Sequence, residues 1–264
     1  MGRDVAIKLV VAPLLIGAAS LAGRRFGHAV GGWLVALPLT SGPVAWFLAR
    51  EHGDAFAATA ALGMLAATAS QVAFALAYRA VDGPRWATSF AAGASAFLVS
   101  TLLLARLELS ALATFALVAG IIAVGILVTR RGAPTRADTA PVAAPRFDLA
   151  ARMGVATAVV VAITALAPAI GPHLAGLVSP FPVFGAVLAV STHRVYGAPA
   201  AGAVLDGLLV GLAAPAVFFL VLALALPPLG LLAFALASGL ALAAQGATAV
   251  VLPAAADRDA GADR

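Results

Sequence analysis

The stretch AGLVSPFPVFGAVLAVSTHRVYG, residues 175–197, lines up with the earlier stretch GGWLVALPLTSGPVAWFLAREHG, residues 31–53, without a gap and at a spacing of 144 residues. Chance matches in a chain rich in alanine and leucine would pair those two residue types. The matches here are instead residues that set backbone shape and helix ends. This pattern predicts an internal duplication. The matched pairs include Gly32 with Gly176, Pro38 with Pro182, Arg50 with Arg194, Gly53 with Gly197, Gly63 with Gly207, Phe74 with Phe218 and Pro84 with Pro228.

The composition around these stretches places the chain in a membrane. Of its 264 residues, 63% are hydrophobic and only 10% are charged, whereas soluble domains are roughly 45–50% apolar. This excludes an ordinary soluble domain and a disordered chain. The absence of cysteine from the sequence excludes disulfide scaffolds and cysteine metal sites. Apolar runs separated by charges, proline or glycine predict nine transmembrane helices, over residues 5–22, 28–48, 55–78, 86–105, 109–129, 149–169, 173–192, 198–226 and 230–252.

The duplication and the span count together predict an all-α integral membrane protein with two inverted four-helix repeats. Five crossings separate equivalent points, so the second repeat is expected upside down relative to the first. Inverted repeats of this kind are a recurrent design of secondary transporters. The other interpretation is that duplication only built a stable bundle. The predicted parts are a first repeat (1–108), a linker helix (109–129), a cytoplasmic loop (130–147), a second repeat (148–253) and a cytoplasmic tail (254–264).

The distribution of basic residues predicts the orientation. With nine spans, only four of the 16 Lys and Arg residues fall on one face, namely Arg3, Lys8, Arg50 and Arg106. Positive charge marks the cytoplasmic face, so the N-terminus is expected outside and the C-terminus inside. This distribution explains the net charge of +5, and no nucleic-acid partner is expected.

Prolines inside two equivalent spans mark the first candidate site. Pro38 and Pro182 each remove a backbone donor and tend to break the helix. Interrupted helices at matching positions of two halves indicate a transporter binding site. Thr40, Ser41 and Ser179 lie beside these breaks and are candidates for binding a substrate or the freed backbone groups. Kinks that only shape the bundle are the alternative, because proline is common in membrane helices.

Asp206 is the only acid well inside a predicted span. At 1.5 Å per residue from a helix start near Ala198, it lies about 12 Å along the helix. An acid at that depth is expected to face the bundle interior and either to pair with a cation or to remain protonated. Because no arginine is predicted at a comparable depth, the sequence favours a proton-exchanging acid that couples a proton to substrate movement. The alternative is an acid that reaches toward the interface.

Two arginines and the remaining polar residues complete the candidates. Arg50 and Arg194 end equivalent helices, where they complement the helix dipole or guard the two mouths of a pathway for an anionic substrate. The histidines lie at span ends without metal-ligand spacing, so no metal site is expected. The sequence also lacks a phosphate-binding Gly-Lys loop and a hydrolase signature. We therefore expect no cofactor and no enzymatic activity.

The second proline stretch, with Phe181-Pro182-Val183 between a leading and a later glycine, resembles the GlpM-type family of small four-helix bacterial membrane proteins. The first stretch departs from that pattern, with Leu37-Pro38-Leu39 instead. The resemblance implies a bacterial cytoplasmic (inner) membrane and a link to exopolysaccharide production. The arrangement as a whole is similar to that of drug/metabolite transporters, which are built from duplicated four- or five-helix units.

Two functions follow as hypotheses. The first is a secondary transporter, with proton coupling through Asp206, of a small molecule or a lipid-linked envelope precursor. The second is a structural or assembly factor of an envelope-polysaccharide machine. Transport requires polar residues from several helices to converge on a cavity. An assembly factor requires a tight core and a large exposed apolar groove. In either case the expected partner is membrane lipid.

Overall fold

A computed structural model describes residues 25–39, 41–81, 85–104, 106–131 and 180–252, together with isolated residues at 14, 17, 18, 21, 22, 150 and 154. Within these ranges the chain is helical, with turns and short loops and no strand. Most of the first and sixth predicted spans, the predicted cytoplasmic loop, Thr40 and Ser179 lie outside the described residues. Nine spans therefore remain a prediction.

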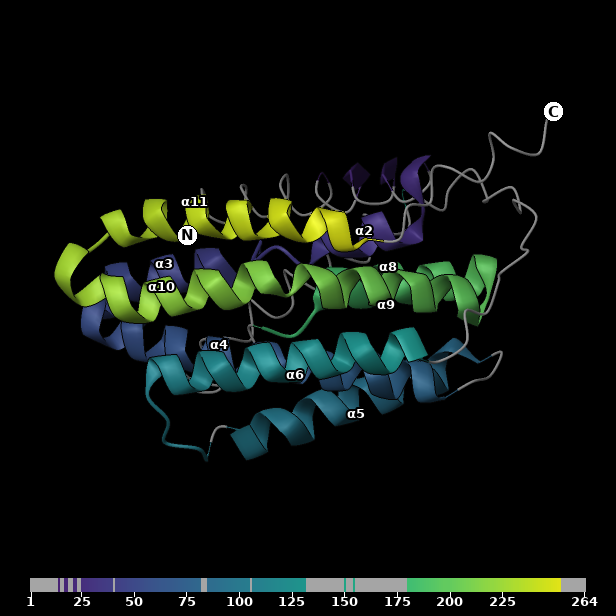
Figure 1. The fold of residues 1–264 in the computed structure, drawn as a ribbon, viewed down its shortest axis with the longest axis horizontal. Coiled ribbons are helices and arrows are strands. Elements are labelled where there is room, and N and C mark those ends of the chain that lie inside the picture. The colour runs from purple at the N-terminus through teal and green to yellow at the C-terminus, as the bar shows by residue number, and fades with distance from the viewer. Residues whose placement is uncertain are drawn as a thin grey trace.

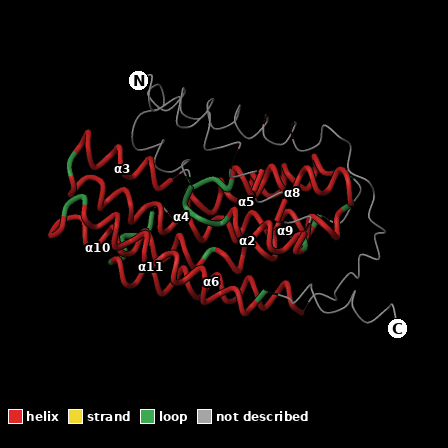
Figure 2. The backbone as a smooth tube through the Cα atoms, turned by 90° about the horizontal axis from the view of Figure 1, so that it is seen from above, coloured by secondary structure: helices red, strands yellow, loops and turns green. Residues whose placement is uncertain are grey.

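The described helices run side by side along the long axis of the molecule (Figures 1 and 2). Their bounds lie within a few residues of the predicted spans wherever both are available. The elements are α2 (His28–Val35), α3 (Ser41–His52), α4 (Asp54–Ala80), α5 (Trp86–Leu104), α6 (Ala111–Arg131), α8 (Val183–Tyr196), α9 (Ala198–Gly211), α10 (Ala213–Leu229), α11 (Leu232–Thr248) and the short 3₁₀ helix η1 (Ala249–Val251).

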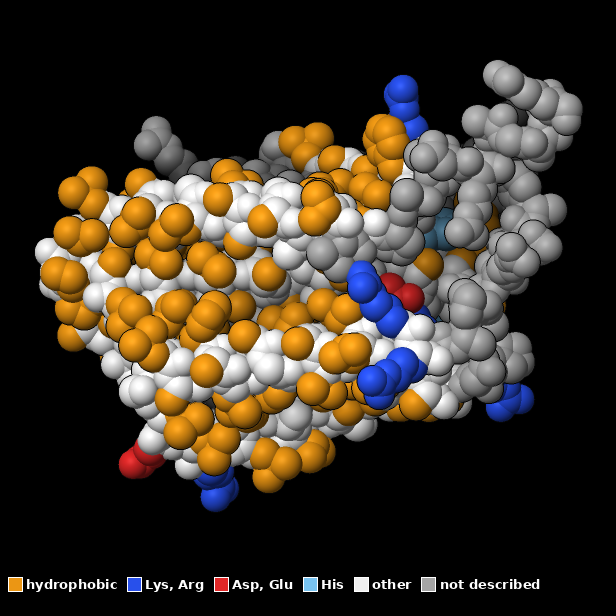
Figure 3. Space-filling model, viewed as in Figure 1, with side chains coloured by type: hydrophobic (Ala, Val, Ile, Leu, Met, Phe, Trp, Pro, Cys, Tyr) orange, Lys and Arg blue, Asp and Glu red, His pale blue; other side chains and the backbone are white. Residues whose placement is uncertain are grey.

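Four helical segments of the described part are long and apolar enough to cross a membrane: Asp54–Ala80, Trp86–Leu104, Ala111–Arg131 and the continuous run Ala198–Leu229. α4 and the α9–α10 run are largely buried and supply much of the core. α5 and α6 instead expose large apolar side chains such as Leu98, Leu103 and Leu112. In water such a surface would be unfavourable, and it fits a bundle surrounded by lipid (Figure 3).

Two tight helix-to-helix turns recur at the 144-residue spacing. α3 passes into α4 at Gly53, and α8 passes into α9 at Gly197, with φ angles of 87° and 85°. A side chain with a Cβ rarely adopts this left-handed backbone, so glycine is favoured at both turns. The N–H of Gly53 donates to the Ala49 carbonyl at 3.1 Å, and that of Gly197 donates to the equivalent His193 carbonyl at 3.0 Å.

The two predicted proline breaks also share their backbone geometry. The N–H of Leu39 donates to the Leu37 carbonyl, and that of Val183 donates to the Phe181 carbonyl, both at 2.7 Å. One turn later, the carbonyls of both prolines accept the first helical bond of α3 and of α8, at 2.9 Å from Gly42 and at 2.7 Å from Ala186. The interruption predicted at Pro38 is confirmed, because this residue lies between α2 and α3. Pro182 directly precedes α8, and the chain before Pro180 lies outside the described residues, so an interruption there stays a prediction.

The long span predicted over residues 198–226 divides into α9 and α10 at Leu212. Pro215 has no N–H to donate to the Gly211 carbonyl, which is the bond that a continuous helix would make there. The position 144 residues earlier holds Gln71, and α4 continues through it without interruption. One proline therefore makes the two equivalent helices differ.

The turns between equivalent helices lie at opposite ends of the molecule. In Figure 1 the α3–α4 turn and the α10–α11 turn lie at the left end, whereas the α8–α9 turn and the end of α6 lie at the right. α4 packs against α5, α10, α3 and α6, and α9 packs against α2 and α8.

These positions give the topology prediction. Single cysteines that replace His52, beside the α3–α4 turn, and Arg131, at the end of α6, should be labelled from opposite faces of the membrane. The chain contains no cysteine of its own, so each label reports one position. The measurement is reaction with an impermeant thiol reagent in intact cells and in inside-out vesicles. Labelling of both cysteines from the same face would contradict the predicted orientation.

Candidate functional site

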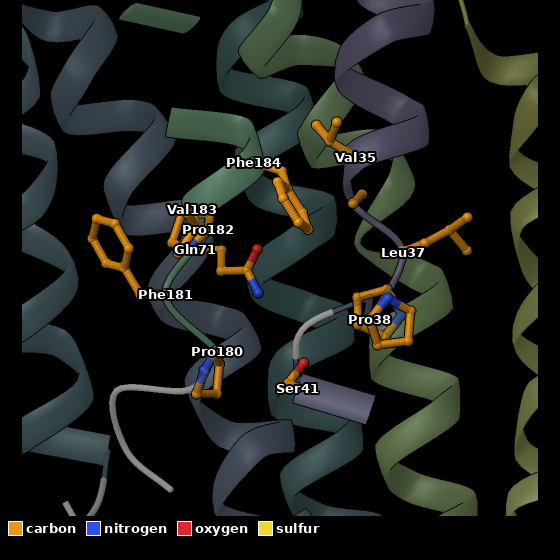
Figure 4. Close-up of a pocket in the computed structure, with 12 residues that line it drawn as sticks. Val35, Leu37, Pro38, Ser41, Gln71, Pro180, Phe181, Pro182, Val183 and Phe184 are labelled. Carbon is orange, nitrogen blue, oxygen red and sulfur yellow. The ribbon is translucent and has the colours of Figure 1, made fainter. Parts of the chain in front are cut away.

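The two proline breaks face each other across a small cavity (Figure 4). Its volume is about 20 Å³, which is room for about one water molecule. Gln71 and Pro215, which stand 144 residues apart, also line it, so equivalent positions of both halves meet there. The full lining is Val35, Ala36, Leu37, Pro38, Ser41, Gln71, Pro180, Phe181, Pro182, Val183, Phe184 and Pro215.

Few polar groups reach this cavity. The Gln71 side chain extends from α4 into the space between the breaks (Figure 4), and both Gln71 and Ser41 are buried. Pro38 leaves the backbone carbonyl of Leu34, one turn earlier, without its helical donor. These groups can hydrogen-bond a small polar molecule. In this conformation the space accommodates a water molecule and nothing much larger.

A second group of polar residues lies near the turn between α8 and α9. The Nη1 atom of Arg79, in the last turn of α4, is 2.9 Å from Oδ1 of Asp206 on α9. Gly202, one turn before Asp206, makes room for the guanidinium, because a Cβ there would lie 2.8 Å from Nη1 of Arg79. The expectation that no arginine reaches the depth of Asp206 is therefore wrong. The long Arg79 side chain extends inward from the helix end.

A buried hydrogen bond accompanies this ion pair. The Tyr78 hydroxyl and Nδ1 of His193 lie 3.1 Å apart, and both residues are at least 96% buried, with exposures of 3% and 4%. Tyr78 precedes Arg79 on α4, so adjacent residues tie α4 to α8 and to α9. We call Tyr78, Arg79, His193 and Asp206 the polar cluster. Sequence reasoning missed all of its members except Asp206.

The polar cluster belongs to one half of the duplicated sequence. At the equivalent positions the other half carries Leu222 for Tyr78, Ala223 for Arg79, Ala49 for His193 and Leu62 for Asp206. A comparison of the two repeats would have found the cluster, because each of its polar residues has an apolar counterpart in the other repeat. The charge of Arg79 alone would not have identified the cluster, because this residue is at a helix end, where arginine is common.

Arg50 and Arg194 lie in the last turns of α3 and α8, as predicted. Both are exposed, and neither lines the cavity. The Arg194 guanidinium carbon lies 5.9 Å from the centre of the Trp86 ring, which is within the range of a cation–π contact.

Within the described ranges, no group of three or more His, Asp or Glu residues is arranged to hold a metal ion.

The fold and its apolar helices define an all-helical membrane protein. No family model, curated protein or solved structure matches the chain. The resemblance to the GlpM-type family therefore stays a prediction that rests on the proline stretches.

Proposed function

We propose that this protein is a secondary transporter of a small molecule or a lipid-linked precursor, built from two inverted repeats that exchange between two conformations. The cavity between the two proline breaks carries the proposal. Paired interruptions at equivalent positions of two halves are where such transporters bind their substrates. Here the breaks share their backbone hydrogen bonds and meet at one point.

The positions of the turns support the inversion. The turns at Gly53 and Gly197 have the same backbone angles, yet they lie at opposite ends of the molecule (Figure 1). A chain whose equivalent turns alternate in this way has equivalent helices that run in opposite directions. Exchange of conformation between such halves converts an opening toward one face into an opening toward the other.

The polar cluster fits this proposal as a contact that holds one end closed. It joins α4 of the first repeat to α8 and α9 of the second through an ion pair and a buried hydrogen bond. Opening the cavity toward that end requires these helices to separate, which breaks both contacts. Protonation of the Asp206 carboxylate would remove one charge of the ion pair, and this is how a proton could be coupled to opening.

An assembly factor is the second candidate function. It is favoured by the small volume of the cavity and by the apolar faces of α5, α6 and α11. A protein with that role would keep a closed core and bind its partners through lipid-facing helices.

A cysteine that replaces Ser41, at the cavity, separates the two functions. Transport predicts that an impermeant thiol reagent modifies this cysteine in right-side-out and in inside-out vesicles, because each conformation opens the cavity to one face. The control is a cysteine that replaces Ala237 on α11, which is fully buried away from the cavity and should stay unmodified. If the cysteine at 41 is unreactive from both faces while one at His52 reacts, the assembly factor is the better description.

A further inference from the structure

A second, larger space opens between α4, α5 and α6, away from the proline breaks. Its volume is about 160 Å³, comparable to the engineered cavity of roughly 150 Å³ that binds benzene. In the described part of the chain, no atom outside the adjacent backbone of α4 lies within 4 Å of the position where Gly63 would carry a Cβ, so this face of α4 is open there. We call this space the outer groove. Its lining is Thr59, Leu62, Gly63, Ala66, Ala67, Thr101, Leu104, Leu107, Leu109 and Thr114.

One polar atom in the wall of the outer groove lacks a partner. Thr101 is 3% exposed, and its hydroxyl Oγ1 makes no hydrogen bond to any residue that the structure describes. In contrast, Thr114 and Thr59, which also line the groove, donate to the carbonyls of Ser110 and Ala55 on their own helices. A buried hydroxyl without a partner is unfavourable, so the groove favours a ligand that brings an acceptor to Thr101.

The equivalent groove of the second half shows what kind of group fits there. Its wall contains Gln245 at the position of Thr101, and Nε2 of Gln245 donates to the backbone carbonyl of Trp33 on α2 at 2.6 Å. At the position of Gly63 stands Gly207, where a Cβ would overlap the carbonyl of Ala29. α2 therefore fills the second groove and places a carbonyl oxygen against its polar residue.

The outer groove begins beside the connection between α5 and α6, at one end of the bundle. α4 begins at Asp54, α5 ends at Leu104, and the exposed charges of Arg106 and Glu108 lie in the connection to α6. The groove reaches from that connection inward along α4 toward Ala67. In a bilayer, this is where lipid ester groups meet the acyl chains.

We propose that the outer groove binds one acyl chain of a membrane lipid and that the carbonyl oxygen of its ester linkage accepts a hydrogen bond from Oγ1 of Thr101. The comparison of the two grooves rests on the duplication used in the proposed function. The apolar walls, the volume and the unpartnered hydroxyl do not depend on it.

Photolabelling tests this proposal on the full chain in nanodiscs. The probe is a phosphatidylglycerol with a diazirine on its acyl chain near the ester, and the labelled residues are located by mass spectrometry. Labelling should concentrate on residues 101–109. Gly63→Leu, which fills the groove, should reduce this labelling at least fivefold. The matched control is Gly120→Leu on α6, which also has open space but lies outside the groove and should leave the labelling unchanged.

A second variant tests the hydrogen bond. Thr101→Val keeps the shape of the side chain and should reduce labelling by the ester lipid about fivefold, which corresponds to one ordinary hydrogen bond. Labelling by the ether-linked analogue, which has no carbonyl, should not change. Labelling spread evenly over α5 and α6, or unaffected by Gly63→Leu, would overturn the proposal.

The sequence counterpart of α2, residues 172–179, is the competing occupant. Efficient disulfide formation between cysteines that replace Gly63 and His173, the positions equivalent to Gly207 and Ala29, would assign the groove to the chain itself and overturn lipid binding. Neither result alters the access test at Ser41, so the failure of this proposal is distinguishable from the failure of the transport proposal.

Discussion

Asp206→Leu should lower the free energy of unfolding by about 2 kcal/mol, and adding Arg79→Met should restore most of it. The single variant leaves the Arg79 guanidinium without its partner inside the bundle, a change that costs roughly 3–5 kcal/mol for a fully buried pair. The side chains here are 25% and 35% exposed, so a smaller loss is expected. Leucine is a suitable replacement because Leu62 occupies the equivalent position in the first half.

The measurement is a double-mutant cycle on the purified protein in detergent, followed by chemical or thermal denaturation. Arg50→Met is the control, since this arginine is exposed in the last turn of α3, and its removal should change stability by no more than about 0.5 kcal/mol. If the losses from Asp206→Leu and Arg79→Met simply add, the two side chains do not stabilise each other. The ion pair would then have no part in holding that end closed.

Gly207→Ala should destabilise the protein strongly, whereas Gly63→Ala should not lower its stability. A Cβ at Gly207 would overlap the backbone carbonyl of Ala29, so α2 would have to move away from α9. Overpacking of this kind costs typically 1–3 kcal/mol, and displacement of a rigid backbone places the expected loss near 3 kcal/mol. At Gly63 no atom of a neighbouring described segment is within 4 Å of the Cβ position, and alanine is favoured over glycine inside a helix by roughly 0.5–1 kcal/mol.

The two variants form a matched pair, because both add the same atom at the same position of the two repeats. Thermal denaturation in detergent and the yield of folded protein after purification measure the difference. Equal effects of Gly207→Ala and Gly63→Ala would mean that α2 does not pack closely on α9. The groove beside Gly207 would then not be filled by α2, and it would not differ from the outer groove beside Gly63.

Much of the helical layout could be predicted from the sequence because lipid imposes a simple rule on span length. The predicted spans at 55–78, 86–105 and 109–129 match α4, α5 and α6, and the proline at 38 interrupts a helix as expected. The division at Leu212 could not be predicted as easily. Proline is tolerated in membrane helices, and whether Pro215 bends the helix depends on the packing around it.

The candidate site was predictable only in part. The proline pattern located the cavity because a missing donor acts locally, whatever surrounds it. The partner of Asp206 is instead an arginine on another helix, whose long side chain extends inward from the helix end. Counting residues along one helix gives the depth of the backbone only and does not include the length of that side chain. Gly202 was the available signal, since a residue without a side chain one turn from a buried acid leaves space for a cation.

The placement of the polar cluster in one half has a consequence for how duplicated proteins specialise. In a dimer of identical subunits every residue occurs twice, so the contacts that close one end must also close the other. A single chain with two copies is free of that constraint, and here one copy keeps Asp206 where the other has Leu62. If such an ion pair contributes about 1 kcal/mol, the state it closes is favoured about fivefold over its mirror state. If the protein transports as proposed, a fused pair of repeats thereby acquires a preferred conformation, open to one face of the membrane, which two separate identical subunits could not have.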